Sequence, residues 1–113
     1  MKFSATVTLQ YDTIFSSFSH EEYLKGLDWM QQSCLDGAEL CISSYSDIDL
    51  GRVKAELDER GLGCSTISTG QSRTREGISL LHEGAALRIA QERMKQHIDA
   101  AAVLKSCVTL GLL

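Results

Sequence analysis

Residues 2–9 of the chain, Lys-Phe-Ser-Ala-Thr-Val-Thr-Leu, alternate strictly between polar and apolar side chains. A period of two residues is typical of a β-strand with one face toward a core, so we expect a strand over Met1–Leu9. The polar positions hold Lys2 and small hydroxyl residues instead of a second set of aliphatic side chains. This strand therefore predicts a sheet that helices cover on one face only.

The rest of the chain continues the alternation of strands and helices. Further strands are expected over Ala38–Ser43, Leu62–Thr69 and Cys107–Leu113. Apolar residues at helical spacing, with end signals, predict three helices: one between the Ser19–Glu22 capping box and Asp36-Gly37, one that Asp47 or Asp49 caps and Gly61 ends, and one over Glu83–Ser106. Alternating units of this kind predict an α/β fold with a parallel sheet.

The two faces of the expected strands differ in composition. One face carries aliphatic residues: Ala5, Val7, Leu9, Leu40, Ile42, Ile67, Val108, Leu110 and Leu112. The other face is small or polar: Ser4, Thr6, Thr8, Glu39, Cys41, Ser43, Cys64, Thr66, Ser68, Cys107, Thr109 and Gly111. A doubly wound sheet has helices on both faces, whereas a (β/α)₈ barrel has them outside only. We therefore expect half of a TIM barrel, with four strands and three helices.

Length and composition indicate one folded domain over residues 1–113. The chain has 113 residues, of which 43% are hydrophobic and 23% are charged, as is usual for globular domains. A net charge of −4 gives no general attraction to nucleic acid or to an anionic membrane. No signal peptide or apolar run of membrane-spanning length is present, so we expect a cytoplasmic protein.

A spaced set of residues resembles a known family. It consists of Ser68-Thr69-Gly70-Gln71, Gly77-Ile78-Ser79-Leu80, Arg88, Arg93, His97-Ile98, Ala101 and Val108-Thr109-Leu110-Gly111, with Glu39-Leu40 earlier. The set is similar to the N-terminal half of the xylose-isomerase-like TIM-barrel family, the sugar phosphate isomerase/epimerase group. The resemblance covers essentially the whole chain and is most specific between Ile67 and Gly111.

This resemblance implies a metal-dependent sugar or sugar-phosphate isomerase or epimerase as the parent enzyme, with Mn²⁺, Co²⁺, Mg²⁺ or Zn²⁺. Family members hold the ion through Glu, Asp, His and Glu of later strands, and none of these falls on a position of this sequence. We therefore expect the chain to contribute pocket loops without metal ligands and to be inactive alone. It would be a fragment or a natural half-length protein.

The stretch that follows the third expected strand is the main candidate site. Its residues place hydroxyl, amide and guanidinium groups where ligands of barrels bind: Ser68, Thr69, Gly70, Gln71, Arg73 and Arg75. We expect a loop from Gly70 to about Ser79 that binds a phosphate or a sugar hydroxyl; a solvated loop without a ligand is the alternative. Tyr11, Ser43 and Tyr45 follow the first two strands and would edge the same pocket, unless they are ordinary loop residues.

Other polar residues favour structural roles. Glu39 lies near the start of the second expected strand, so we expect it to be a hydrogen-bonded carboxylate in the barrel floor, away from the catalytic rim. His97 lies on an apolar helix stripe and predicts a packed, hydrogen-bonded histidine. His20 and His82 lack partners at ligand spacing, and the four cysteines lack the short spacing of zinc or redox sites, so neither kind of site is expected here.

Three further interpretations stay open. A flavodoxin-like domain would use Ser68–Thr74 to bind the phosphate of a flavin such as FMN, although such loops normally follow the first strand. A non-catalytic assembly module and an endonuclease-type metal barrel are the others, with the acidic net charge against the endonuclease. A half barrel also exposes unpaired N–H and C=O groups on its terminal strands, so we expect a homo-oligomer.

Overall fold

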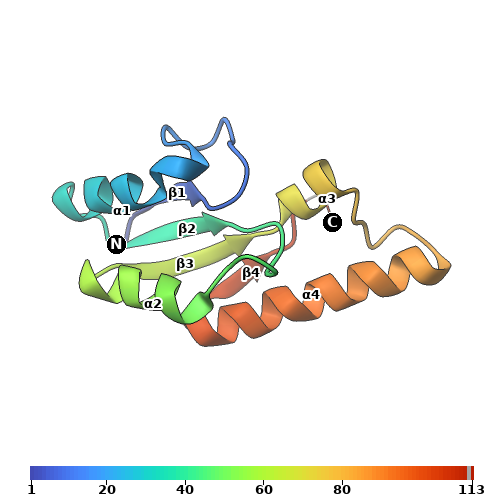
Figure 1. The fold of residues 1–113 in the computed structure, drawn as a ribbon. Helices are drawn as coiled ribbons and strands as arrows, with labels where there is room; N and C mark the ends of the chain where they lie inside the picture. The colour runs from blue at the N-terminus through green and yellow to red at the C-terminus, as the bar shows by residue number, and fades with distance from the viewer. Residues whose placement is uncertain (112) are drawn as a thin grey trace.

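A computed structural model of the chain, which describes residues 1–111 and 113, contains one parallel sheet with the strand order β1-β2-β3-β4 (Figure 1). The elements are β1 (Ser4–Thr8), the 3-10 turn η1 (His20–Glu22), α1 (Tyr23–Gln32), β2 (Gly37–Cys41), α2 (Leu50–Glu59), β3 (Gly63–Ser68), α3 (Gly70–Glu76), α4 (Gly84–Leu104) and β4 (Cys107–Thr109). The α/β fold with a parallel sheet is confirmed. Each strand pairs with the next along the chain, as in a (β/α)₈ barrel, and the order has no reversal of the doubly wound kind.

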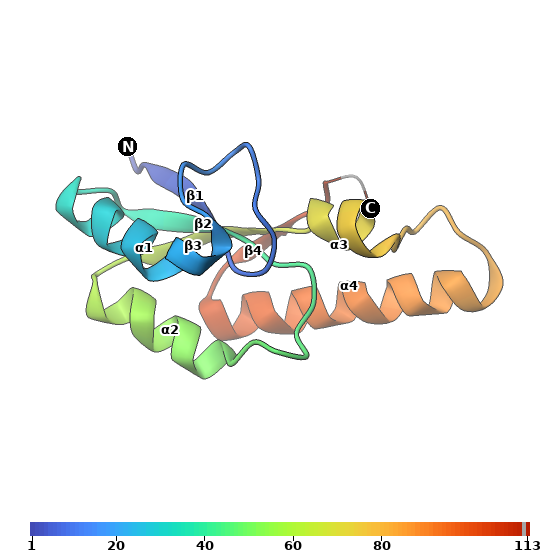
Figure 2. The same ribbon diagram turned by 45° about the horizontal axis from the view of Figure 1, so that its top comes forward.

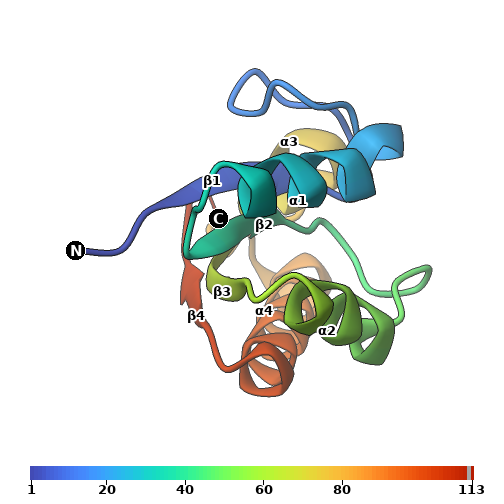
Figure 3. The same ribbon diagram turned by 90° about the vertical axis from the view of Figure 1, so that its left-hand side faces the viewer.

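Helices α1, α2 and α4 cover one face of the sheet. α1 contacts β1 and β2, α2 contacts β3, and α4 contacts β3 and β4. Figure 3 shows the three helices on the same side of the strands. We call the other side, which carries the small and polar residues, the open face. The one-sided cover agrees with the difference in composition between the two faces.

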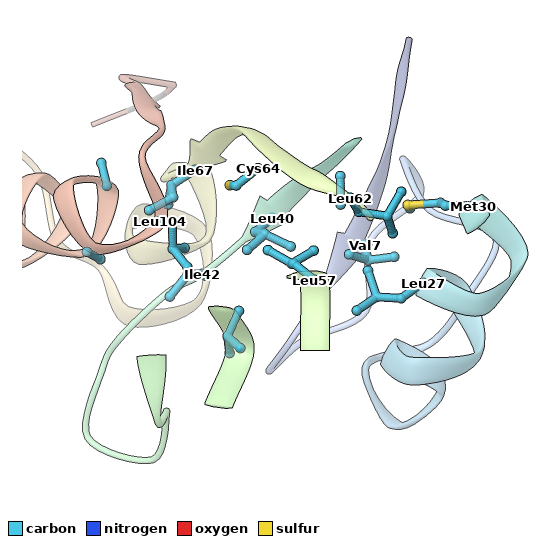
Figure 4. Packing of buried hydrophobic residues seen from close by; sticks show 14 residues of the cluster. Val7, Leu27, Met30, Leu40, Ile42, Leu57, Leu62, Cys64, Ile67 and Leu104 are labelled. Carbon is cyan, nitrogen blue, oxygen red and sulfur yellow. The ribbon is translucent and has the colours of Figure 1, made fainter. Parts of the chain in front are cut away.

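The core lies between the sheet and these helices. Val7, Leu40 and Ile67 point from β1, β2 and β3 toward the helices and are fully buried (Figure 4). Leu27 of α1 and Leu104 of α4 belong to the same cluster. Burying a side chain of this size stabilises a fold by about 1.5–3 kcal/mol, so the aliphatic face of each strand determines where the helices pack.

A bulge in β3 corrects the predicted orientation of Cys64. Ala38 pairs with Cys64 and Glu39 pairs with Thr66, so Ser65 is an extra residue in the strand. As a result Cys64 lies in the core and is 9% exposed, although simple alternation placed it on the polar face. The alternation is regular again from Thr66 onward, because the core residue Ile67 follows it.

The last strand is shorter than predicted. β4 ends at Thr109, and only its central Val108 packs against the core. Leu110 was expected on the apolar face but follows the end of the strand and is 56% exposed. Leu112, which was assigned to the same face, lies outside the described residues.

The segment Gly70–Glu76 forms helix α3, where a loop was predicted. The helix ends at Gly77, which has a φ of 69°, a left-handed conformation that glycine adopts readily. Gln71 and Ser72 are buried and hydrogen-bonded to the loops after β1 and β2, and these tertiary contacts stabilise a helix of low intrinsic propensity. The described residues therefore form four α-helices where three were expected, and Figure 2 shows α3 beside the middle of α4.

The predicted helix starts are correct, whereas α1 ends at Gln32, before the predicted stop at Asp36-Gly37, because Cys34 turns into a left-handed conformation with a φ of 58°. Ser19 and Glu22 form the expected capping box, in which the Ser19 N–H donates to Glu22 Oε1 at 3.1 Å, and η1 leads from there into α1. Asp49, one of the two proposed caps, accepts from the Arg52 N–H at 3.1 Å and opens α2. These side chains satisfy N–H groups that have no partner inside a helix.

Two further features concern the whole described chain. Within the described residues, no helix is both long enough and apolar enough to cross a lipid bilayer. All four cysteines are free thiols, with Cys41 and Cys64 buried and Cys34 and Cys107 exposed. The fold is therefore held by packing and hydrogen bonds without a disulfide.

Candidate functional site

A pocket of about 510 Å³ lies on the open face, near the carboxyl ends of the strands. Its described lining residues come from the loop after β1, from β2, from β3 and α3, and from β4 and its continuation: Thr13, Phe15, Glu39, Cys41, Ser68, Thr69, Gly70, Gln71, Thr74, Thr109 and Gly111. We call it the open-face pocket. Its volume is in the range of small-molecule sites.

The pairing of the strands explains why this pocket is polar. Thr8, Cys41, Ser68 and Thr109 occupy one row across the sheet, and Glu39 lies in the row before it. These side chains point away from the helices because the aliphatic neighbours of each strand face the core. The pocket floor therefore consists of hydroxyl groups, a thiol and a carboxylate.

Glu39 and Ser68 form the central polar pair of the pocket. The Ser68 hydroxyl donates to Glu39 Oε1 across adjacent strands. Glu39 was expected in the barrel floor, away from the rim, but it lies in mid-strand and lines the same pocket as Ser68 and Gly70. The prediction of a hydrogen-bonded carboxylate is correct, whereas its separation from the candidate site is wrong.

Cys41 lines the pocket as a neutral thiol. It is 7% exposed, and burial, with a smaller effect of the Glu39 charge, raises the pKa of its thiol to about 11. The thiolate is the nucleophilic form of cysteine. At neutral pH this side chain is therefore a small apolar group in the pocket wall.

Four of the predicted site residues come together at the pocket: Ser68, Thr69, Gly70 and Gln71. Two of them are also anchors of the surrounding structure. The buried Thr69 hydroxyl donates to the Thr109 carbonyl at 2.9 Å, and Gln71 Nε2 donates to the Tyr11 carbonyl at 2.7 Å. These bonds hold β4 and the loop after β1 at the two sides of the pocket.

Tyr11, Arg73 and Arg75 lie outside the lining. The Arg75 guanidinium carbon is 5.6 Å from the centre of the Tyr11 ring, and its Nη2 donates to the Asp12 carbonyl at 3.1 Å. Both arginines are exposed and neither is among the described lining residues. Because α3 is a helix, its side chains point in several directions, and Thr74 faces the pocket between the two arginines.

Ser43 and Tyr45 belong to a buried network that lies apart from the pocket lining. The Ser43 hydroxyl donates to Glu76, whose carboxylate also pairs with Arg93 at 3.1 Å. The Tyr45 hydroxyl lies 2.7 Å from His97 Nδ1. The two residues predicted to edge the pocket therefore connect the loop after β2 to α3 and α4.

His97 is fully buried within this network, as predicted. Its Nε2 lies 3.0 Å from the Ser72 hydroxyl, which itself donates to the Ser43 carbonyl. All partners are satisfied when Nε2 carries the proton and Nδ1 accepts from Tyr45. Burial, reinforced by the Arg93 charge, lowers the pKa of His97 to about 4, so the ring is neutral near pH 7.

Several lining residues were not predicted as site residues. Glu39, Cys41 and Thr109 were on the polar strand face, and the alternation alone could have assigned them to a pocket on that face. Thr13 and Phe15 come from the loop after β1, and no spacing signal in the sequence indicates that this loop reaches the pocket.

The open-face pocket does not offer the donor set of a divalent metal site. Glu39 is its single carboxylate, and the other described lining groups are neutral. Within the described part of the chain, no group of three His, Cys, Asp or Glu side chains is placed to hold a metal ion. We therefore derive no chemical step through a metal from these residues.

Comparisons with known proteins give no family assignment for the chain. No protein-family model matches it, and no curated protein matches its sequence significantly.

Proposed function

We propose that the open-face pocket binds a sugar, and that the chain forms the substrate-binding half of a sugar isomerase or epimerase barrel. The observation that carries this proposal is the pocket itself, which lies at the carboxyl ends of parallel strands, where barrel enzymes bind their substrates. The sequential strand order and the one-sided helices support the barrel relationship, because four such strands are half of the eight in a barrel.

The chemistry of the lining suits a polyhydroxylated ligand. Ser68 and Thr109 offer hydroxyl groups, Gln71 offers its amide oxygen as an acceptor because its NH₂ group donates to Tyr11 and Thr8, and Glu39 offers a strong acceptor. Phe15 is 77% exposed at the rim, where its ring can cover the apolar face of a sugar. Sugars combine hydroxyl edges with such apolar faces.

Proton transfer and metal binding would be supplied by residues outside this chain in the complete enzyme. The described residues provide binding and orientation of the substrate, which account for a large part of enzymatic rate enhancement. We assign the protein to the cytoplasm in this proposal, because its free thiols suit a reducing compartment.

Titration of the ¹⁵N-labelled chain with D-xylulose and D-fructose tests the proposal. We expect millimolar binding, with chemical-shift changes concentrated at the amides of Ser68, Gln71 and Thr109. Ser68→Ala should weaken binding several-fold. The matched control Ser65→Ala, at the exposed bulge residue, should not change it.

Two results bear on the proposal in different ways. Absence of localised shifts with either ketose would show that the pocket is not a sugar site. Turnover of a ketose by the chain with added Mn²⁺ would contradict the part of the proposal that places the chemistry outside the chain.

A further inference from the structure

The open-face pocket has an uneven distribution of charge. Glu39 is the single charged residue among its described lining residues, and all the others are neutral. The Glu39 side chain is half-buried in the middle of β2 and receives one hydrogen bond, from Ser68. The pocket therefore has a net negative charge.

No salt bridge among the described residues neutralises this carboxylate. Arg75 is held by the Tyr11 ring and the Asp12 carbonyl, and Arg93 is paired with Glu76 on the other side of α3. Among the described residues Glu39 forms no salt bridge, so its one partner is the neutral Ser68 hydroxyl. A carboxylate that is partly removed from water gains most from a partner that carries positive charge.

A phosphate group in the same pocket would be repelled by Glu39 instead of attracted to it. Its two negative charges would lie beside Glu39 in a pocket whose described lining has no basic side chain. Like charges at close distance weaken binding, and burial increases the effect because the local dielectric constant is lower than in water. The arginines that the sequence suggested for phosphate binding do not line the pocket.

We infer that the open-face pocket selects an amine-bearing sugar over a neutral sugar, and a neutral sugar over a phosphorylated one, with Glu39 as the selecting residue. This inference rests on the proposed function, since it specifies the class of sugar. The ammonium group of the ligand would donate to Glu39, while its hydroxyl groups would bind the Ser68, Gln71 and Thr109 side chains.

Three ligands on one sugar skeleton test the order: D-glucosamine, D-glucose and D-glucose 6-phosphate, each titrated into the ¹⁵N-labelled chain at about pH 6.5. We expect D-glucosamine to bind about tenfold more tightly than D-glucose, which corresponds to one charge-assisted hydrogen bond at a partly exposed site. D-glucose 6-phosphate should bind more weakly than D-glucose.

Substitution at Glu39 tests whether this residue is the origin of the order. Glu39→Gln should bring D-glucosamine and D-glucose to nearly equal affinity. The control Asp99→Asn removes the same charge at an exposed position on α4, outside the pocket, and should leave the tenfold preference intact. In the unmodified chain the preference should also decrease as salt is raised from 20 to 500 mM, a measurement that requires no variant.

The outcomes separate the two claims. If none of the three ligands shifts the pocket amides, the proposed sugar site is wrong. If D-glucose binds but D-glucosamine gains nothing over it, or if D-glucose 6-phosphate binds best, the sugar site stands and the selection by Glu39 is overturned. A preference that does not respond to salt also contradicts the inference.

Discussion

The phenolic oxygen of Tyr45 lies 2.7 Å from Nδ1 of His97, although 52 positions of sequence separate the two residues. This hydrogen bond joins the loop after β2 to α4, and Ser72 joins α3 to the same imidazole at 3.0 Å. The arrangement requires a neutral ring, because Nδ1 must accept the proton of Tyr45. Protonation of His97 therefore acts against the packing of three elements.

We expect acid to destabilise the protein through His97. An unfolded histidine binds a proton below about pH 6.5, whereas the lowered pKa keeps His97 neutral in the folded state down to about pH 4. Between these values the unfolded state binds more protons, so the free energy of unfolding falls as pH decreases. The loss should be about 2–3 kcal/mol between pH 7 and pH 4.5, measured by urea denaturation.

His97→Gln provides the control for this pH dependence. Glutamine offers a donor and an acceptor but does not titrate, so the variant should be less stable at pH 7 and should lose less stability on acidification. Carboxylates contribute equally to both proteins, and the difference between the two slopes isolates His97. Identical slopes would assign the acid sensitivity to other groups.

Gly37→Ala should destabilise the amino-terminal end of the sheet. A Cβ at this position would lie 2.7 Å from the Gly63 carbonyl oxygen, which is backbone and cannot move aside cheaply. We expect a loss of about 1–3 kcal/mol in the free energy of unfolding. Gly51→Ala is the matched control, because its Cβ meets only the Asp49 side chain at 3.4 Å, and helix propensity should make it neutral or stabilising by up to about 1 kcal/mol.

Gln71→Ala should loosen the rim of the open-face pocket. The Gln71 amide donates to the Tyr11 carbonyl at 2.7 Å and to the Thr8 hydroxyl, and these bonds connect the end of β1 and the loop after it to α3. Without them we expect limited proteolysis within residues 11–18 to become several-fold faster. The free energy of global unfolding should fall by no more than about 1–2 kcal/mol. Gln31→Ala, at an exposed position of α1, should leave the cleavage rate unchanged.

Self-association through the sheet edges is a further prediction. β1 and β4 are the terminal strands, and exposed apolar residues accompany them, with Phe3 59% and Leu110 56% exposed. We expect light scattering to show a homo-oligomer whose mass falls when both residues are replaced by lysine. Ile89→Lys, equally exposed on α4, should have no effect, and a monomer at every concentration would refute the expectation.

Much of the fold follows from alternation alone. The pattern of Val7 and Leu40 against Thr6 and Glu39 predicts parallel strands with helices on one side, since burial of aliphatic side chains determines which face carries the helices. Cys64 was misplaced because one inserted residue reverses the faces of a strand, and nothing local in the sequence indicates Ser65 as that residue.

The candidate site was less predictable than the fold. Ser68 and Gln71 were identified because strand ends in parallel sheets converge, which is a property of topology. Helix α3 was missed because its stability comes from contacts of Gln71 and Ser72 with distant loops, which outweigh local propensity. Glu39 was assigned to the barrel floor because the sequence does not show how β2 is aligned with β3. That alignment places Glu39 next to Ser68.

The sequential strand order also bears on how the protein is made. Each strand finds its partner among residues synthesised shortly before it, because β1, β2, β3 and β4 pair in the order in which they leave the ribosome. A growing sheet of this kind needs no later segment to be inserted between strands already paired. Folding can therefore accompany translation, because each new helix-and-strand unit packs against the edge strand that was synthesised just before it.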